Sequence, residues 1–165
     1  MLNHHLLMEL QEYIEDHLKL ESFAFNLNES NYDIQQEVKQ NEIDDFIKNK
    51  RKPTLNQVLF SFIDAKGVKD SEVYRKAGID RRHFSKIRTK PGYLPKKNTT
   101  IALAFALCLN EADTNELLGA AGYSLSDSDT NDLVIQFCLE KKIYDIDKVN
   151  QALDYFNLKP LTGLF

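Results

Sequence analysis

The sequence predicts an all-α fold. Apolar residues recur at intervals of three and four along most of the 165-residue chain, in short stretches. Cap residues and glycines stand at the ends of these stretches, and the loops between them are brief. Phe23, Phe25 and Leu27 alternate with polar or small residues, but no longer run has the pattern of a strand. We therefore expect a helical bundle with mostly local contacts and no sheet.

Residues 1–49 are predicted to form an acidic helical segment ahead of the bundle. Within it, residues 5–20 carry an apolar stripe with acidic side chains between its members, Leu6, Leu7, Leu10, Ile14 and Leu18. A turn-rich stretch at 26–31 and a less regular helical pattern follow. Residues 50–53 are basic and end in proline, which disfavours a helical conformation in the residue before it, so they are expected to be a linker.

Residues 54–122 are predicted to fold as the main bundle, and this bundle begins with a helix. Thr54 and Gln57 have the spacing of a capping box, and Gly67 has the conformational freedom that a helix end requires. The stripe between them is regular and comprises Leu55, Val58, Leu59, Phe62 and Ile63. We expect one helix that begins after Thr54 and stops at Gly67.

Two shorter helices are predicted next, joined by a tight turn. Asp70 is expected to cap the first helix, which would end at Gly78, and Asp80 to cap the second. In the second helix, Phe84 and Ile87 are three residues apart and must face the core. The other side chains then point outward, and almost all of them are cationic: Arg81, Arg82, Ser85, Lys86 and Arg88.

The second half of the chain is predicted to be helical as well. Residues 101–109 are apolar on nearly every side, as in a helix at the centre of a bundle. Another helix, opened by Asp113, would close at Gly122. Residues 123–165 are predicted to be a C-terminal extension of two helices, whose stripes are Leu133, Val134, Phe137 and Cys138 in one and Ile146, Val149, Leu153 and Phe156 in the other.

Charge is segregated along the chain. Residues 1–49 hold three lysines against eleven acidic residues, a net charge of −8, and residues 98–165 have a net charge of −6. Residues 50–97 hold fourteen Lys and Arg against four acids, a net charge of +10. The overall net charge of −4 therefore hides a local positive field of the kind that attracts phosphates. A solvated basic face that neutralises its acidic flanks would give the same pattern.

The cationic helix at 80–88 is the candidate site, because an α-helix fits the major groove of duplex DNA. Arginine can donate two hydrogen bonds to guanine, so Arg81 and Arg82 in the first turn are the candidates for base contacts, with Lys86 a weaker one. Four further cations are expected to bind backbone phosphates, which fixes register without reading sequence: Arg88, Lys90, Lys96 and Lys97.

The run 70–88, followed by residues 99–118, resembles the helix-turn-helix of the Xre or Cro/phage-repressor family. The resemblance implies a five-helix, lambda-repressor-like fold over residues 54–121, with extra C-terminal helices and the N-terminal segment outside it. It also implies a regulator of transcription in a bacterium or phage that binds duplex DNA sequence-specifically. Residues 121–147 resemble, more loosely, a module found in bacterial and phage proteins of uncertain role, which implies no activity.

Individual positions carry the first resemblance. Gly78 matches the turn glycine of the family, and its base-contacting positions fall on Arg81 and Arg82. The residue after the turn, the cap, the inward apolar residue and the small residue beside it are matched by Ile79, Asp80, Phe84 and Ser85. Tyr74 stands where the family usually has a small alanine, so its ring either shifts the crossing of the two helices or points elsewhere.

Catalytic and metal chemistry have little support in the sequence. His4 and His5 are adjacent and lack the ligand spacing of a metal site, and His83 is expected to contact phosphate or solvent. Helix capping explains the aspartates at 127, 129, 132, 145 and 147. The chain has no phosphate-binding glycine loop, nucleophile elbow or Cys/His couple. We expect neither an enzyme nor a bound metal or other cofactor.

The sequence favours a cytoplasmic protein with no membrane partner. No apolar run reaches the roughly 18 residues that cross a bilayer, and the N-terminus lacks the basic region of a secretory signal. Cys108 and Cys138 fall inside apolar helical patterns, where they are expected to be small hydrophobic residues rather than a disulfide.

Three hypotheses follow from the sequence. The first is a DNA-binding regulator that reads the major groove with helix 80–88, expected to be a homodimer because one short helix makes few contacts. The dimer surface would come from the N-terminal helix or from the helices after Asp129. The alternative is a non-catalytic adaptor whose acidic segment 1–49 docks on a protein partner. In the third, that segment masks the basic block until a partner removes it.

Overall fold

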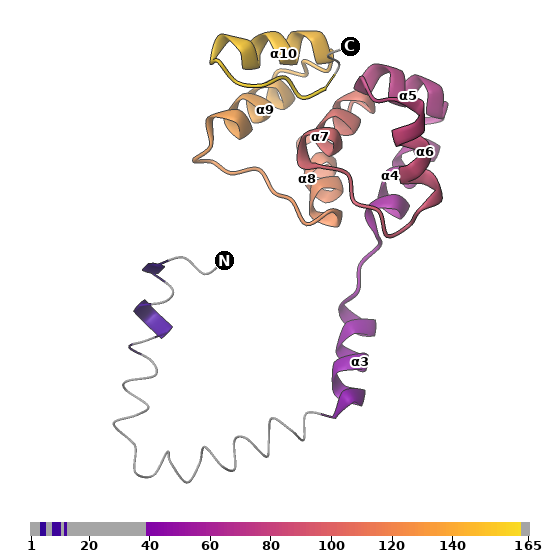
Figure 1. The fold of residues 1–165 in the computed structure, drawn as a ribbon, viewed down its shortest axis with the longest axis vertical. Helices are drawn as coiled ribbons and strands as arrows, with labels where there is room; N and C mark the ends of the chain where they lie inside the picture. Colours follow the sequence, from indigo (N-terminus) through magenta and orange to yellow (C-terminus); the bar gives the residue numbers. More distant parts are fainter. Residues whose placement is uncertain (1–3, 6–7, 11, 13–38, 163–165) are drawn as a thin grey trace. The chain divides into compact units, whose positions relative to one another are not determined.

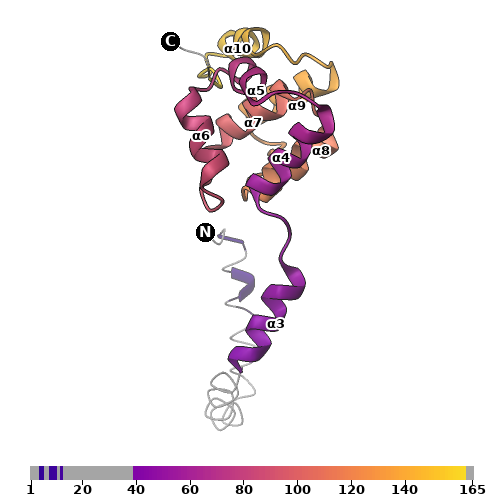
Figure 2. The same ribbon diagram turned by 90° about the vertical axis from the view of Figure 1, so that its right-hand side faces the viewer.

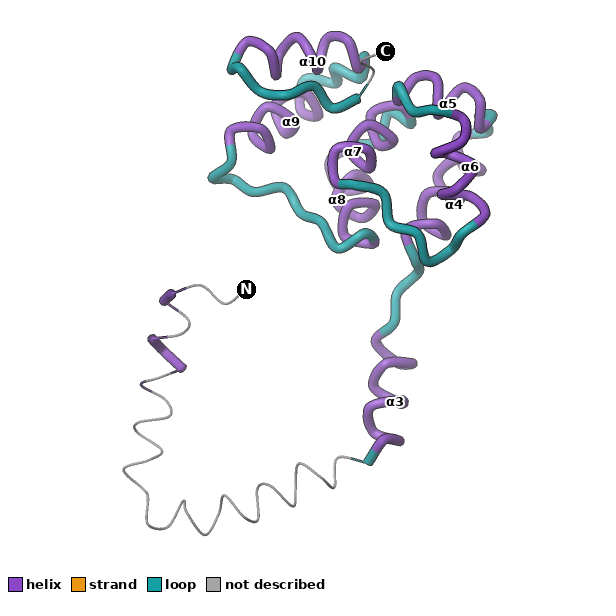
Figure 3. The backbone as a smooth tube through the Cα atoms, viewed as in Figure 1, coloured by secondary structure: helices purple, strands orange, loops and turns teal. Residues whose placement is uncertain are grey.

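The computed structural model describes residues 4–5, 8–10, 12 and 39–162 of the chain. The chain divides into two compact units, Met1–Arg51 and Lys52–Phe165. All regular elements in the described ranges are helices, which confirms the all-α prediction (Figure 3). None of the helices in these ranges is long and apolar enough to cross a bilayer.

The first unit contains helix α3, Gln40–Lys50. This helix has no buried residue, and it ends at Lys50, after which Arg51 has an extended backbone. The end of α3 therefore falls in the basic stretch that the sequence marks as a linker. The predicted helix at 5–20 lies largely outside the described residues, and the alternation at 23–27 lies wholly outside them.

The second unit begins with three helices, in the order that the sequence predicts: α4, Leu55–Lys66, α5, Asp70–Ala77, and α6, Arg81–Thr89 (Figure 1). The predicted capping box is present, since Thr54 Oγ1 accepts a hydrogen bond from Gln57 N at 3.3 Å and Gln57 Oε1 accepts one from Thr54 N at 3.0 Å. Gly67 and Gly78 end α4 and α5 with left-handed backbones, at φ 64° and 68°.

Helix α7, Lys97–Ala106, is the centre of this unit. All of its residues from Thr99 to Ala106 are buried, and it packs against α5, α8 and α10 (Figure 2). Helix α8, Glu111–Ala120, begins at the cap Asn110, ahead of the predicted Asp113, and packs on α4 as well. One hydrophobic core extends from Leu55 in α4 to Leu161 near the C-terminus.

The predicted end of α7 is wrong. The apolar run continues to Leu109, but the helix stops at Ala106, and Cys108 takes a left-handed backbone at φ 52°. Leu109 N then donates to Ala104 O at 3.0 Å, which satisfies a carbonyl at the helix end. The end of α7 has no glycine to mark it, and an L-residue with a side chain rarely adopts this conformation, so the sequence pattern runs past it.

The C-terminal helices form a hairpin: α9, Thr130–Glu140, and α10, Ile146–Tyr155. Their N-caps are the predicted ones, because Asp129 accepts a hydrogen bond from Asn131 N at 3.0 Å and Asp145 accepts one from Asp147 N at 2.9 Å. The hairpin packs on α7 and α8, so the extension shares the core of the bundle.

The segment after α10 returns to the bundle. Asn150 donates to Thr162 O and accepts from Leu161 N, both at 2.9 Å, and Leu161 is buried. Thr162 Oγ1 donates to Ala77 O at the end of α5. This segment therefore links the C-terminal hairpin to the turn between α5 and α6.

The two cysteines differ in their surroundings. Cys138 lies buried in α9, where burial raises the pKa of its thiol. Cys108 is exposed in the turn after α7, so the prediction that both cysteines lie buried inside helices is wrong for Cys108.

The difference between the cysteines predicts a simple labelling result. One thiol of the two should react with Ellman's reagent in the native protein, and both should react in denaturant, because the buried, protonated Cys138 thiol is a poor nucleophile. The variant Cys108→Ser removes the exposed thiol and is the control. Rapid native reaction of Cys108→Ser would show that Cys138 is accessible, contrary to this structure.

Candidate nucleic-acid interface

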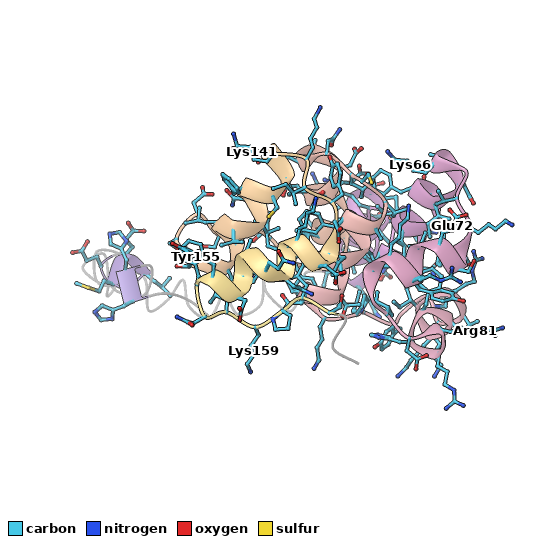
Figure 4. All side chains as sticks on the ribbon, turned by 90° about the horizontal axis from the view of Figure 1, so that it is seen from above. Lys66, Glu72, Arg81, Lys141, Tyr155 and Lys159 are labelled. Carbon is cyan, nitrogen blue, oxygen red and sulfur yellow. The ribbon has the colours of Figure 1, made fainter. Side chains whose placement is uncertain are left out.

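The outer face of α6 carries a stripe of exposed residues. Arg81, Arg82, Ser85 and Lys86 are all exposed, whereas Phe84 and Ile87 are buried, as their spacing predicts. Asp80 caps the helix by accepting a hydrogen bond from Arg82 N at 3.2 Å. Figure 4 shows the Arg81 side chain extended away from the helices. The local sequence therefore gives one buried side and one exposed, mostly cationic side.

Three aromatic rings hold the buried side of α6. The Phe84 ring packs edge-on against Phe60 of α4, with 5.9 Å between ring centroids, and lies 5.6 Å from Tyr74 of α5. Tyr74 is half-buried against the core. Its ring therefore packs between α5 and α6 and does not point away from them.

A side chain from α4 fixes the C-terminal end of α6. Asn56 Nδ2 donates to Ile87 O at 2.7 Å and to Arg88 O at 3.1 Å. These two carbonyls lie in the last turn of α6, where the helix has no further N–H group to donate a hydrogen bond to them. The angle of α6 is thus set by a hydrogen bond across 31 residues of sequence, a contact that sequence spacing does not reveal.

Arg88 is tied to α5 rather than free. Its Nε donates to Asp70 Oδ2 at 2.6 Å and its Nη2 to Asp70 Oδ1 at 2.9 Å, and its guanidinium lies 4.2 Å from the Phe60 ring centroid. The hydrogen bonds that the guanidinium donates to Asp70 raise its pKa above the usual value. The expectation that Asp70 caps α5 is wrong, because the cap position is Lys69 and the Asp70 carboxylate binds Arg88. Arg88 therefore positions α6, although its side chain is still half-exposed.

The loop after α6 folds back onto the cationic face. His83 Nε2 and Tyr93 Oη are 3.0 Å apart, and Lys86 Nζ lies 4.6 Å from the centroid of the Tyr93 ring. The sequence predicted that His83 contacts phosphate or solvent. In the structure His83 is half-buried and forms a hydrogen bond with Tyr93. Tyr93 belongs to this surface but was not predicted from the sequence. It lies in a loop, and nothing in the sequence indicates that this loop folds back against α6.

The remaining expected phosphate contacts lie in different surroundings. Lys90, at the end of α6, and Lys96, at the start of α7, are exposed. Lys97 is half-buried, and its Nζ donates to Asp132 Oδ2 at 2.7 Å. Lys97 is thus engaged in the packing of α7 against α9.

Asp132 is the partner that the sequence did not reveal. It is 1% exposed, and besides Lys97 its carboxylate accepts a hydrogen bond from Ser126 N at 2.8 Å. Burial alone would raise the pKa of this carboxyl, but the hydrogen bonds from Lys97 and Ser126 outweigh it and the pKa lies below the usual value. Asp129 caps α9 and Asp132 lies in its first turn, as the sequence predicts, but the Asp132 carboxylate binds Lys97 and Ser126, which capping does not explain.

The charges on the outer face of α6 are unpaired within the described part of the chain. There, none of Arg81, Arg82 and Lys86 forms an ion pair with a carboxylate. Within the same residues, no three His, Cys, Asp or Glu side chains gather in a group that could hold a metal ion. The surface can therefore offer several unneutralised donors to an anion.

Comparison with known proteins does not identify this surface. No protein-family model, no curated protein and no solved structure matches the chain.

Proposed function

We propose that this protein binds duplex DNA sequence-specifically through α6, as a regulator of transcription with a lambda-repressor-like helix-turn-helix. The observation that carries the proposal is the exposed stripe of Arg81, Arg82 and Lys86, which pairs with no carboxylate of the described residues. Unpaired, outward cations on one helix are what a groove lined by phosphates requires.

The dimensions of α6 suit the major groove. An α-helix with its side chains is about 10–12 Å across, which matches the width of the groove, about 12 Å, and the nine residues of α6 give it a length of about 14 Å along the groove. Arg81 and Arg82 stand in its first turn, where helix-turn-helix proteins contact base edges, and each guanidinium can donate two hydrogen bonds to one guanine. We assign base contacts to these two arginines.

The bracing of α6 supports the same function. Asn56 donates a hydrogen bond to a carbonyl in its last turn, and Asp70 forms an ion pair with Arg88. On its buried side, the Phe84 ring packs against Phe60. A rigid helix loses little conformational entropy on binding, so more of the contact energy remains for discrimination between bases. Lys90 and Lys96 are exposed and available for phosphates, whereas Lys97 is held by Asp132.

Salt dependence of binding tests the electrostatic part of the proposal. With about four phosphate contacts, the affinity of the full chain for a random duplex should fall roughly 100-fold between 50 and 200 mM salt, as counterions are released. Fluorescence anisotropy with a labelled duplex measures this slope. A salt-independent affinity, or no binding at low salt, would contradict the proposal.

A single lysine should change that slope without changing sequence preference. Lys96→Ala is expected to weaken binding to all duplexes alike and to make the slope shallower by about 0.9, because one phosphate contact is lost. The matched control is Lys66→Ala, which removes an exposed lysine on the opposite side of the unit from Arg81 (Figure 4). Equal effects of the two substitutions would mean that only net charge matters and that Lys96 lies outside the interface.

A further inference from the structure

The loop of residues 90–96 is fixed against one flank of α6. At its start, Tyr93 N donates a hydrogen bond to Lys90 O at 2.9 Å, which closes a turn. Near its end, Pro95 is buried, and Pro95 O accepts a hydrogen bond at 2.9 Å from the hydroxyl of Tyr123, whose ring packs against the core. The loop is therefore tied to the bundle on both sides of Tyr93.

The Tyr93 ring contacts two side chains of α6 that lie one turn apart. Its Oη is 3.0 Å from His83 Nε2, and the two rings meet edge-on with 5.8 Å between their centroids. The Lys86 Nζ lies over the ring, 4.6 Å from its centroid, where the face of the ring attracts a cation. His83 and Lys86 are three residues apart, so they lie on the same flank of the helix. Tyr93 therefore restrains Lys86 through its ring and is itself held by His83 through its hydroxyl.

This flank lies to one side of the line on which Arg82 points outward. Successive residues of an α-helix are turned by about 100°, so Arg82 points away from the buried pair Phe84 and Ile87. Lys86 is turned by about 40° from Arg82, toward His83. When a helix lies in the major groove, its outermost line faces base edges and its flanks face the two phosphate backbones that border the groove. The Tyr93 ring therefore holds Lys86 on the side of a backbone and away from the bases.

We propose that Tyr93 is a positioning residue that holds the Lys86 ammonium for a backbone phosphate, so that Lys86 fixes register and does not read bases. This inference rests on the proposed binding of DNA through α6, and it adds the loop 90–96 to the interface. Lys86 pairs with no carboxylate of the described residues, and the ring occupies only one side of its ammonium, so N–H donors remain for a phosphate. A restrained lysine also loses less side-chain entropy on binding than a free one.

NMR spectroscopy of the full chain without DNA tests the contact itself. The ring current of Tyr93 should shift the Hε resonances of Lys86 upfield of those of the other lysines. Tyr93→Phe keeps the ring and should keep this shift, whereas Tyr93→Leu should remove it. Tyr155→Leu is the matched control and should leave the shift unchanged, because Tyr155 is 82% exposed and lies at the opposite end of the unit from Arg81 (Figure 4). Lys86 resonances at the ordinary lysine position in the native chain would overturn the proposal.

A double-mutant cycle on duplex affinity tests whether Tyr93 acts through Lys86. Tyr93→Leu should weaken binding to a selected and to a random duplex alike, by about threefold, which is the effect of one cation–ring contact. In a Lys86→Ala chain the same substitution should cause almost no further loss, because the side chain that the ring restrains is already absent. In a Lys66→Ala chain, the matched control, Tyr93→Leu should keep its full effect. Tyr93→Phe should bind within about twofold of the native chain, since it retains the ring.

The outcomes of this cycle separate the role of Tyr93 from the proposed function. Independent losses from Tyr93→Leu and Lys86→Ala would overturn the positioning role, and so would a Lys86→Ala chain that loses its preference for the selected duplex. Both results would leave α6 as the helix that binds DNA. A native chain that binds no duplex at low salt would instead contradict the proposed function, and the phosphate contact of Lys86 with it. Circular dichroism of every variant distinguishes these results from loss of fold.

Discussion

Replacing Arg81 and Arg82 together with alanine is expected to reduce affinity for a selected duplex at least 100-fold and to abolish preference over random sequence. Each arginine that binds one guanine through two hydrogen bonds contributes about 1–3 kcal/mol of discrimination, and a loss of 2.7 kcal/mol is about 100-fold. Both side chains are exposed and neither pairs with a described carboxylate, so the fold should be unchanged.

The measurement is anisotropy on the selected and the random duplex, side by side. Arg75→Ala with Lys76→Ala is the matched control, because these two exposed cations lie on α5 beside Tyr144, away from the outer stripe of α6. The control should keep the ratio of the two affinities, while the Arg81 and Arg82 variant should bring that ratio close to one. If the Arg81 and Arg82 variant still prefers the selected duplex over the random one, α6 does not read the base sequence.

The largest effect on stability is expected at Asp132. Asp132→Asn should lower the free energy of unfolding by about 3 kcal/mol, because the half-buried Lys97 ammonium loses the carboxylate that it binds at 2.7 Å. Urea unfolding at pH 7 measures the change. Asp154→Asn, which alters an exposed aspartate of the same hairpin, should cost less than about 0.5 kcal/mol. Equal losses from the two substitutions would show that the Lys97–Asp132 pair does not hold α7 to α9.

The same pair should show itself in the pH dependence of stability. The pKa of Asp132 is lower in the folded chain than the usual value, so the unfolded chain takes up this proton first as pH falls. The stabilisation is therefore complete above about pH 4 and is lost as pH falls through the folded pKa. The stability difference between the native chain and Asp132→Asn should shrink from pH 7 to pH 3. A constant difference would mean that the carboxylate charge is not its source.

Helix starts could be predicted from the sequence more reliably than helix ends. The capping box at Thr54 and the caps Asp80, Asp129 and Asp145 act within two or three residues, so their spacing is visible in the sequence. Glycine marks the ends of α4 and α5 in the same way. The ends of α7, α9 and α10 instead place left-handed backbones at Cys108, Lys142 and Asn157. Asparagine is one of the residues that adopt this conformation, but cysteine and lysine rarely do, so nothing local marks the ends of α7 and α9.

For the candidate site too, local features could be predicted from the sequence, whereas contacts between helices could not. The outward position of Arg81 and Arg82 follows from the burial of Phe84 and Ile87, which is local periodicity. The pairs Arg88–Asp70 and Lys97–Asp132 join residues 18 and 35 positions apart, and only the packing of helices brings them together. The spacing of residues in the sequence therefore could not distinguish the cations that form ion pairs within the fold from those that remain unpaired.

Selection of bound oligonucleotides from a random duplex pool tests the central claim most directly. The full chain is expected to retain duplex at low salt and to enrich a short motif that contains guanine, since Arg81 and Arg82 are the base-reading side chains. The Arg81→Ala, Arg82→Ala variant should enrich no motif from the same pool. A native chain that retains no duplex, or that enriches nothing, would contradict the claim that α6 enters the groove of DNA and reads it.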